Sequence, residues 1–155
     1  MRTLRRKDRE RPEDFALAVT DNCDWAVMAT VNSDGSPYCI PLSPAREGEW
    51  LYFHSAVEGH KLDNLKADNR VCISCVGNAV PVPEAYSLAY ESAVINGKAQ
   101  EVTDREERIH ALKLICQRYT PESTAGFDAA MEKNFNRTAV WKIHIDHICG
   151  KARPK

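Results

Sequence analysis

The sequence lacks any long apolar run. No stretch approaches the roughly 20 apolar residues that a membrane-spanning helix needs, and the first residues contain no apolar segment typical of a secretory signal. An excess of one charge is also missing, because 21 Lys and Arg residues balance 22 Asp and Glu residues to a net charge of −1. We therefore expect a cytoplasmic protein with no membrane or nucleic-acid partner.

Other familiar signatures are missing too. No G-x-G-x-x-G segment follows a strand-like stretch, so the sequence carries no nicotinamide-binding motif. Internal repeats and low-complexity linkers are absent. A chain of 155 residues is expected to form a single domain over 1–155, with the charged residues 1–11 as an N-terminal extension.

The cysteines and histidines show no metal-binding spacing. Cys72 and Cys75 form a C-x-x-C, but they lie in a strand-like segment, where residues three apart point to opposite faces. The same rule places His144 and His147 on opposite faces of the last predicted strand. No second Cys or His pair has the spacing of a zinc site. We expect six free thiols, core packing for the C-x-x-C and no bound metal.

Apolar and β-branched segments predict six strands. The predicted strands are residues 25–31, 37–43, 50–55, 71–76, 90–102 and 138–148. Asp34 and Gly35 predict a hairpin turn between the first two, and Pro41 predicts an edge or a bulge in the second. Residues 78–87 contain two prolines and are expected to form a loop.

Helical periodicity appears between and around these strands. The predicted helices are residues 11–22, 60–66, 103–119 and 124–135. Thr103 and Glu106 have the spacing of a capping box at the start of the third helix. The pattern as a whole predicts an α+β, mainly β protein: a six-stranded antiparallel β-barrel with flanking helices.

The segment 51–61 gives the clearest indication of a binding site. A strand ends in His54 and Ser55, and Gly59 then opens a helix that carries His60 and Lys61. A helix N-terminus presents free N–H groups and partial positive charge, which suits a phosphate, and Lys61 adds a point charge. These residues are equally typical of a capped helix with a solvent-facing lysine, so the pattern alone leaves both interpretations open.

Short motifs follow one another along the chain in a fixed order. They are the charged start at 1–10, Met-Ala-Thr at 28–30, Asp-Gly-Ser-Pro-Tyr at 34–38, Ile-Pro-Leu-Ser at 40–43, Phe-His-Ser-Ala at 53–56, Gly-His-Lys at 59–61, Tyr-Glu-Ser at 90–92, Gly-Lys-Ala at 97–99, Ile-Asp at 145–146 and Gly-Lys-Ala at 150–152. Through them the chain resembles the pyridoxamine-phosphate-oxidase-like flavin proteins, and within these the nitroimidazole-resistance subfamily. The resemblance implies a split β-barrel that forms a homodimer, with one FMN at each of two clefts between the subunits.

The resemblance also implies which residues contact the cofactor. They are Met28, Ala29 and Thr30 near the ring or the ribityl chain, Pro41, Leu42 and Ser43 at the ring edge, Phe53, His54, Ser55 and Ala56 along the ribityl-phosphate side, His60 and Lys61 at the phosphate, and Trp141, which reaches across from the partner subunit. The family often has arginine where this chain has His60. Because imidazole is only partly charged near neutrality, phosphate binding is expected to depend on Lys61.

The implied function is an FMN-dependent oxidoreductase that reduces nitro or other electron-poor small molecules. His54 is the expected catalytic residue, as a proton donor or a substrate contact; a role as part of the pocket wall stays open. Two alternatives remain: a flavin-binding module that is not an enzyme, and a haem-binding relative on the same scaffold. No set of pyridoxal-phosphate-binding residues matches, so oxidation of vitamin B6 is not expected.

Overall fold

The computed structural model describes residues 4–154, so Met1, Arg2 and Thr3 of the family-like first segment lie outside the described residues. The strands are β1 (Glu10–Arg11), β2 (Ala26–Val31), β3 (Pro37–Leu42), β4 (Ala45–Glu47), β5 (Trp50–Ala56), β6 (Arg70–Val82), β7 (Ser87–Glu101) and β8 (Thr138–Arg153). The α-helices are α1 (Glu13–Asn22), α2 (His60–Ala67), α3 (Arg105–Tyr119) and α4 (Phe127–Asn134). The short 3₁₀ helices are η1 (Lys7–Arg9), η2 (Pro83–Ala85), η3 (Pro121–Gly126) and η4 (Phe135–Arg137). No helix within the described residues is long and apolar enough to cross a membrane.

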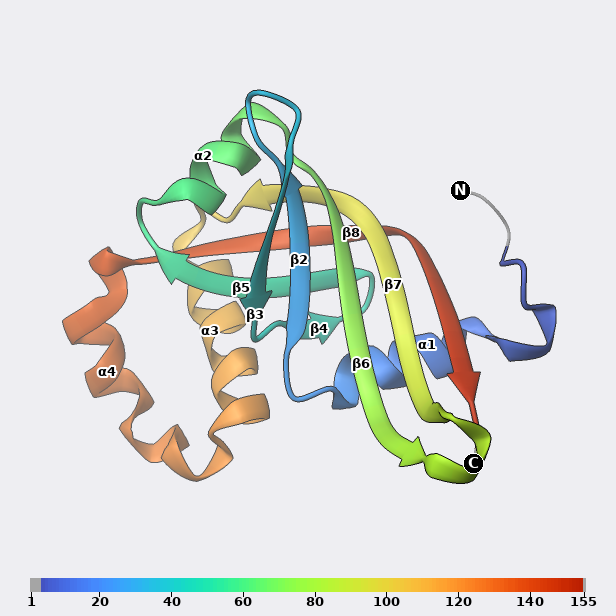
Figure 1. Cartoon of the computed structure of the whole chain (residues 1–155). Coiled ribbons are helices and arrows are strands. Elements are labelled where there is room, and N and C mark those ends of the chain that lie inside the picture. Colours follow the sequence, from blue (N-terminus) through green and yellow to red (C-terminus); the bar gives the residue numbers. More distant parts are fainter. Residues whose placement is uncertain (1–3, 155) are drawn as a thin grey trace.

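All the strands belong to one antiparallel sheet that curls into an open barrel. Its order is β3-β2-β6-β7-β8-β5-β4, and β1 pairs with the end of β8. Figure 1 shows β2, β6 and β7 running across the direction of β5 and β8, so that the sheet bends back on itself. β3 and β4 end the order and are not paired with each other, which leaves the barrel split between them. The predicted α+β class and split barrel are confirmed.

The sheet has eight strands where the sequence predicts six. The two additional strands are β1, with two residues, and β4, with three. Strands this short cannot show the alternation on which sequence prediction depends. β1 pairs Glu10 with Lys151, so the end of the predicted N-terminal extension joins the sheet.

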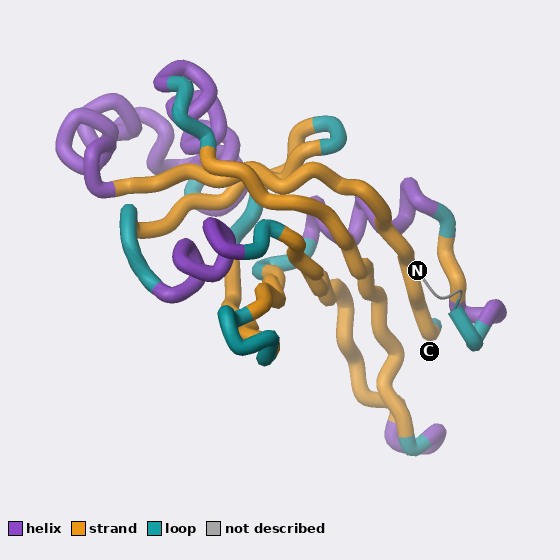
Figure 2. Tube along the Cα trace, turned by 90° about the horizontal axis from the view of Figure 1, so that it is seen from above, coloured by secondary structure: helices purple, strands orange, loops and turns teal. Residues whose placement is uncertain are grey.

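The β6–β7 hairpin is longer than predicted. Residues 78–82, expected in a loop, continue β6 past a register irregularity between Gly77 and Val80. The hairpin projects beyond the rest of the sheet (Figures 1 and 2) and turns at η2. In a two-stranded ribbon each strand has a free edge, which allows Pro81 to sit in β6 although it cannot donate a hydrogen bond.

β8 separates two hydrophobic cores. Trp141 and Ile143 belong to the larger core. This core lies between α1 and the inner faces of β2, β5, β6 and β7. Val140, one residue from Trp141, belongs to the smaller core under α3 and α4. The central part of β8 is therefore buried on both faces, because helices cover both sides of the sheet there.

A β-bulge in β8 changes the predicted faces of its histidines. The register between β7 and β8 shifts beside Asp146, which becomes an extra residue in β8. Ile145 and Ile148 consequently both pack against the larger core. The prediction that His144 and His147 lie on opposite faces is therefore wrong, because it assumed an unbroken alternation along the strand.

The N-cap of α3 lies one residue after the predicted one. The Asp104 side chain accepts a hydrogen bond from the backbone N–H of Glu107 at 2.8 Å, whereas Thr103 and Glu106 were predicted to form the capping box. Asp and Thr are both favourable N-caps, so the sequence contains two overlapping signals. The structure uses the second.

Candidate cofactor site

The turn between β5 and α2 brings the predicted site residues to the open side of the barrel. Gly59 has a φ of +132°, in the region that favours glycine, and α2 begins directly after it at His60. No side chain caps this helix. The backbone N–H groups of His60 and Lys61 are therefore available to a ligand, because the first N–H groups of a helix have no partner within it.

A buried polar network holds α2 against β2. The Asn64 amide donates to the Thr30 hydroxyl at 3.0 Å and to the Asn32 side-chain oxygen at 2.7 Å, and both Asn64 and Thr30 are buried. The His60 ring packs on Tyr38 of β3 with the centroids 4.2 Å apart. These contacts fix the N-terminal turn of α2 beside the β2–β3 hairpin.

Lys61, the predicted cationic contact of the phosphate, has no anion paired with it within residues 4–154. It is half-buried, and within residues 4–154 it forms no ion pair or side-chain hydrogen bond. Asp63, in the same helical turn, is exposed and forms no ion pair with Lys61. Partial burial of the ring, and then the charge of Lys61, lower the pKa of His54 below its usual value. The two residues thus form an electropositive site in which His54 is neutral at neutral pH.

An apolar hollow of about 320 Å³ lies beside His54. Ser43, from the link between β3 and β4, and His54 supply polar groups, while α3, α4 and the connection between them supply mainly apolar and aromatic side chains. These are Leu112, Ile115, Cys116, Tyr119, Thr120, Phe127 and Met131. The hollow can receive a small, weakly polar molecule with one end at His54.

The predicted contact residues fall into two groups. Ala29, Pro41, Ser43, His54, Ala56, His60 and Lys61 are exposed or half-buried. The side chains of Met28, Thr30, Leu42, Phe53, Ser55 and Trp141 are buried. The Ser55 hydroxyl donates to the Ala56 carbonyl at 2.8 Å. Residues of the second group can offer a ligand mainly their backbone groups.

Trp141 does not fit the role that the family resemblance implies. Its side chain is 3% exposed in the larger core, and its indole N–H has no hydrogen-bond partner there. A side chain enclosed by its own subunit cannot cover a flavin in the partner. We therefore remove Trp141 from the candidate contacts. The side chain is enclosed because helices cover both faces of β8 at this point.

Three parts of the candidate site were not among the contact residues predicted from the sequence. Tyr38 and Asn64 position α2, and α3 supplies a wall of the hollow through Leu112. Asn64 follows His60 by four residues, a spacing that puts the two on one face of a helix. That spacing was a usable signal for Asn64, whereas nothing in the local sequence places α3 beside β5.

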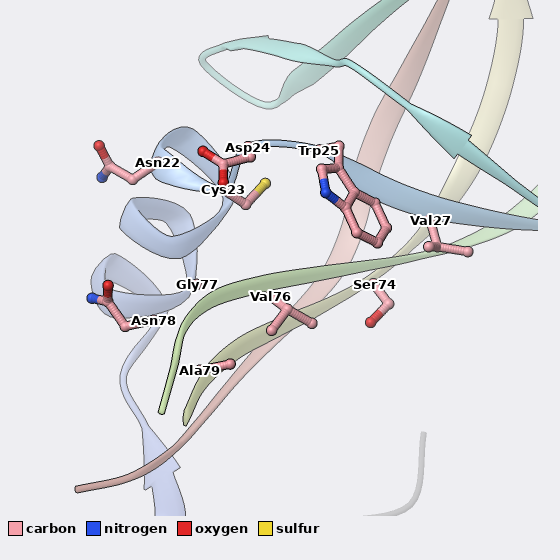
Figure 3. A pocket seen from close by; sticks show the side chains of 10 residues that line it. All are labelled: Asn22, Cys23, Asp24, Trp25, Val27, Ser74, Val76, Gly77, Asn78 and Ala79. Atoms are coloured by element: carbon pink, nitrogen blue, oxygen red, sulfur yellow. The ribbon is translucent and has the colours of Figure 1, made fainter. Parts of the chain in front are cut away.

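A second hollow, of about 620 Å³, lies away from this site between the end of α1 and the strands β2 and β6 (Figure 3). It shares no lining residue with the hollow at His54. No group of three or more His, Cys, Asp or Glu side chains within residues 4–154 is arranged to hold a metal ion.

The split barrel and the electropositive helix end define a class of protein, and the comparison with known families names it. The chain belongs to the pyridoxamine 5'-phosphate oxidase family, whose sequence model matches residues 17–152. This confirms the resemblance found in the short motifs. No curated protein matches the chain.

Solved structures with this fold include a candidate 5-nitroimidazole antibiotic resistance protein from Bacteroides thetaiotaomicron. It is 28% identical with a TM-score of 0.75, over 91% of this chain and 84% of that one. An FAD- and haem-binding protein from Mycobacterium smegmatis is 21% identical, with a TM-score of 0.81, over 95% and 74%. An FAD-binding protein from Mesorhizobium loti is 19% identical, with a TM-score of 0.70, over 94% and 98%. The last two similarities concern the fold alone.

Proposed function

We propose that this protein binds FMN at the site built by His54, His60 and Lys61, and that it acts as an oxidoreductase on nitro or other electron-poor small molecules. The observation that carries the proposal is Lys61: a half-buried cation at an uncapped helix end, with no anion beside it within residues 4–154. A charge in this position is best satisfied by an anionic ligand. Family membership supports a flavin phosphate as that anion.

The residues present fit a terminal monophosphate. Lys61 offers the charge, the first turn of α2 offers backbone N–H groups, and His60 offers a ring N–H held in place by Tyr38. FMN ends in such a phosphate, whereas FAD continues into a second phosphate and an adenosine. With a single lysine at the helix end, the site supports FMN as the ligand in preference to FAD.

The flavin ring is proposed to lie along β3. This strand ends the sheet order, so one edge of its backbone is free to hydrogen-bond a ligand. Pro41 and Ser43 are exposed at this edge, and Ser43 also lines the hollow beside His54. A ring in this position would leave the hollow free for a substrate.

The chain's own groups would position the substrate and supply a proton. FMN, when bound, supplies the reversible uptake and release of electrons. The apolar walls from α3 and α4 would exclude water and hold a weakly polar ring. His54, whose pKa is lowered by partial desolvation of the ring and by Lys61, would donate a hydrogen bond to a polar atom of the substrate from one ring nitrogen, and in its protonated form would transfer a proton there.

We also propose a homodimer. Val80, Tyr86 and Leu88 are exposed apolar residues of the projecting β6–β7 hairpin. An apolar ribbon of this kind is stabilised when a second copy covers it. The six cysteines, free in the structure, support the cytoplasm as the proposed location, because thiols stay reduced there.

The cofactor released from purified protein tests the proposal. Chromatography after denaturation is expected to yield FMN, and the native absorption spectrum is expected to show flavin bands without a Soret band. Recovery of FAD alone, or of haem, would contradict the cofactor assignment. Bound FMN without turnover of a nitro compound under a chemical reductant would favour a flavin-binding module instead. Sedimentation at micromolar concentration tests the dimer against a 17.5 kDa monomer.

A further inference from the structure

Most of the polar side chains in the hollow beside His54 are already bonded within the protein. The hydroxyls of Tyr119 and Thr120 donate to backbone carbonyls at 2.9 and 3.3 Å, and the Cys116 sulfur lies 3.4 Å from the Thr120 hydroxyl oxygen. The Ser43 hydroxyl and the His54 ring line the same hollow, and within residues 4–154 neither side chain forms a hydrogen bond. These two groups are therefore left for a bound molecule.

The backbone beside Ser43 is held by the end of α3. Pro44 is fully buried in the link between β3 and β4. Its carbonyl oxygen accepts two hydrogen bonds, from Arg118 Nη1 at 2.7 Å and from the Tyr119 hydroxyl at 2.9 Å. On the other side of Ser43, Leu42 is the last residue of β3 and pairs with β2. Ser43 thus lies between two anchored residues, and the position of its hydroxyl depends on both.

Arg118 is itself fixed at further points. Its Nη2 donates to the carbonyl oxygens of Thr20 and Cys23 at 2.9 and 2.8 Å, at the end of α1. Carbonyls in the last turn of a helix have no partner within it and carry partial negative charge, so a guanidinium suits them. No carboxylate forms an ion pair with Arg118 within residues 4–154. The side chain that holds Pro44 is therefore anchored on α1.

Tyr119 joins the wall of the hollow to this anchor. Its ring lines the hollow, while its hydroxyl bonds to the Pro44 carbonyl. Burial raises the pKa of this hydroxyl to about 12, against the weaker effect of Arg118. The phenol therefore keeps its proton and stays a hydrogen-bond donor at ordinary pH.

We propose that Ser43 is a substrate contact whose hydroxyl donates a hydrogen bond to the nitro group of the substrate, and that Arg118 and Tyr119 are positioning residues that hold Ser43 in place. This inference rests on the proposed function, which supplies the substrate. A nitro group has two acceptor oxygens, so a bond from Ser43 adds to one from His54 instead of competing with it. A similar ring without an acceptor leaves both donors unpaired in the complex.

Binding of nitrobenzene to the purified, oxidised protein tests the contact, with toluene as the ligand of similar shape that has no acceptor. Equilibrium dialysis measures both. Ser43→Ala is expected to weaken nitrobenzene binding about three- to tenfold, as for the loss of one hydrogen bond, and to leave toluene binding unchanged. Ser33→Ala is the matched control, because Ser33 is exposed in the turn between β2 and β3. Unchanged nitrobenzene binding in Ser43→Ala, an equal loss of toluene, or no binding to the unaltered protein would overturn the proposal.

A double-mutant cycle tests the two positioning residues. Tyr119→Phe keeps the ring that lines the hollow and removes the hydrogen bond to the backbone. It is expected to weaken nitrobenzene binding about threefold when Ser43 is present, and to have no effect in a Ser43→Ala background. Arg118→Lys keeps the charge but lacks the planar fork of donors, and should behave in the same way. A loss of equal size in both backgrounds would indicate a general effect on the fold or a direct contact by Tyr119, and would refute the positioning roles.

The FMN content and the rate of nitro reduction in the same preparations separate this inference from the proposed function. Ser43→Ala keeps the backbone of β3, along which the flavin ring is proposed to lie, so it is expected to retain FMN. An unaltered protein that binds nitrobenzene but lacks FMN or turnover contradicts the proposed function alone. Full FMN content and turnover, with nitrobenzene binding that Ser43→Ala does not change, contradict the Ser43 contact alone.

Discussion

Lys61 and Lys142 are two half-buried lysines with opposite surroundings. The Lys142 ammonium lies 2.7 Å from the Glu107 carboxylate and 4.8 Å from the centre of the Trp50 ring. The same carboxylate oxygen accepts a hydrogen bond from the Tyr52 hydroxyl at 3.1 Å. Lys61 has no such partner within residues 4–154. The fold itself supplies an anion for Lys142, whereas the charge of Lys61 is left to pair with a ligand.

The neighbours of the two lysines reflect this difference. Burial and then the Glu107 carboxylate raise the pKa of Tyr52 to about 12, so this residue stays a neutral hydrogen-bond donor. Burial and then Lys61 lower the pKa of His54. A cluster whose charges cancel adds stability to the fold, whereas an uncancelled cation next to a histidine with a lowered pKa is typical of a binding or catalytic site.

The largest expected effect is on turnover. His54→Ala is expected to keep most of the FMN affinity and to slow the reoxidation of reduced flavin by a nitro compound about a hundredfold, as for the loss of a general acid. Anaerobic stopped-flow measures the rate per bound flavin. His110→Ala is the matched control, because His110 pairs with Glu47 on the outside of α3 and should leave the rate unchanged. Loss of FMN with an unchanged rate per bound flavin would make His54 part of the pocket wall only.

The next effect concerns cofactor affinity and compares the two lysines directly. Lys61→Ala is expected to weaken FMN binding about ten- to a hundredfold, because a charge-assisted hydrogen bond contributes roughly 1.5–3 kcal/mol. Lys142→Ala is expected to leave FMN binding unchanged. Fluorescence titration measures both, and riboflavin, which has no phosphate, should bind to the protein and both variants almost equally. An equal loss of riboflavin and FMN in Lys61→Ala would disprove the phosphate assignment.

The order of the two lysines is expected to reverse for the free energy of unfolding, where the larger effect belongs to Lys142. Lys142→Ala leaves the Glu107 carboxylate without its cation and should lower the free energy of unfolding by about 1–2 kcal/mol, after allowance for the 17% and 28% side-chain exposure of the pair. Lys61→Ala removes no internal partner and should change it by less than about 0.5 kcal/mol. Urea unfolding without flavin measures both. A larger loss for Lys61→Ala would show that Lys61 is satisfied within the fold after all.

The smallest expected effect is a shift in pH dependence. If protonated His54 delivers the proton, the rate should be highest in acid and fall as the pH rises through a midpoint below the usual 6.5. Lys61→Ala should move this midpoint upward, since it removes the second cause of the lowered pKa. The linked effect on folding has the opposite sign: stability is fully present above pH 6.5 and is lost as the pH falls through the lowered pKa of His54. A pH series of the stopped-flow rate measures the midpoint, and a midpoint that Lys61→Ala leaves in place would contradict the coupling.

Local sequence determined most of the elements and part of the site. The Asp34–Gly35 turn, the strands of alternating residues and the placement of His60 and Lys61 directly after Gly59 are local patterns, and the structure reproduces them. Turn chemistry and side-chain periodicity act over a few residues, so they can be recognised without knowing the fold. The ordered motifs further identified the family, because together they extend over nearly the whole chain.

Only the tertiary structure decided which of these residues have partners. Lys61 and Lys142 look alike in sequence, yet only Lys142 meets a carboxylate, because α3 carries Glu107 over β5 and β8. Alternation predicts the face on which Trp141 lies, but not that both faces of β8 are covered. Nor does the sequence show that Arg118, 95 residues further along the chain, donates to the Cys23 carbonyl at 2.8 Å. Burial and pairing depend on contacts between segments distant in the chain, and no local pattern records which segments meet.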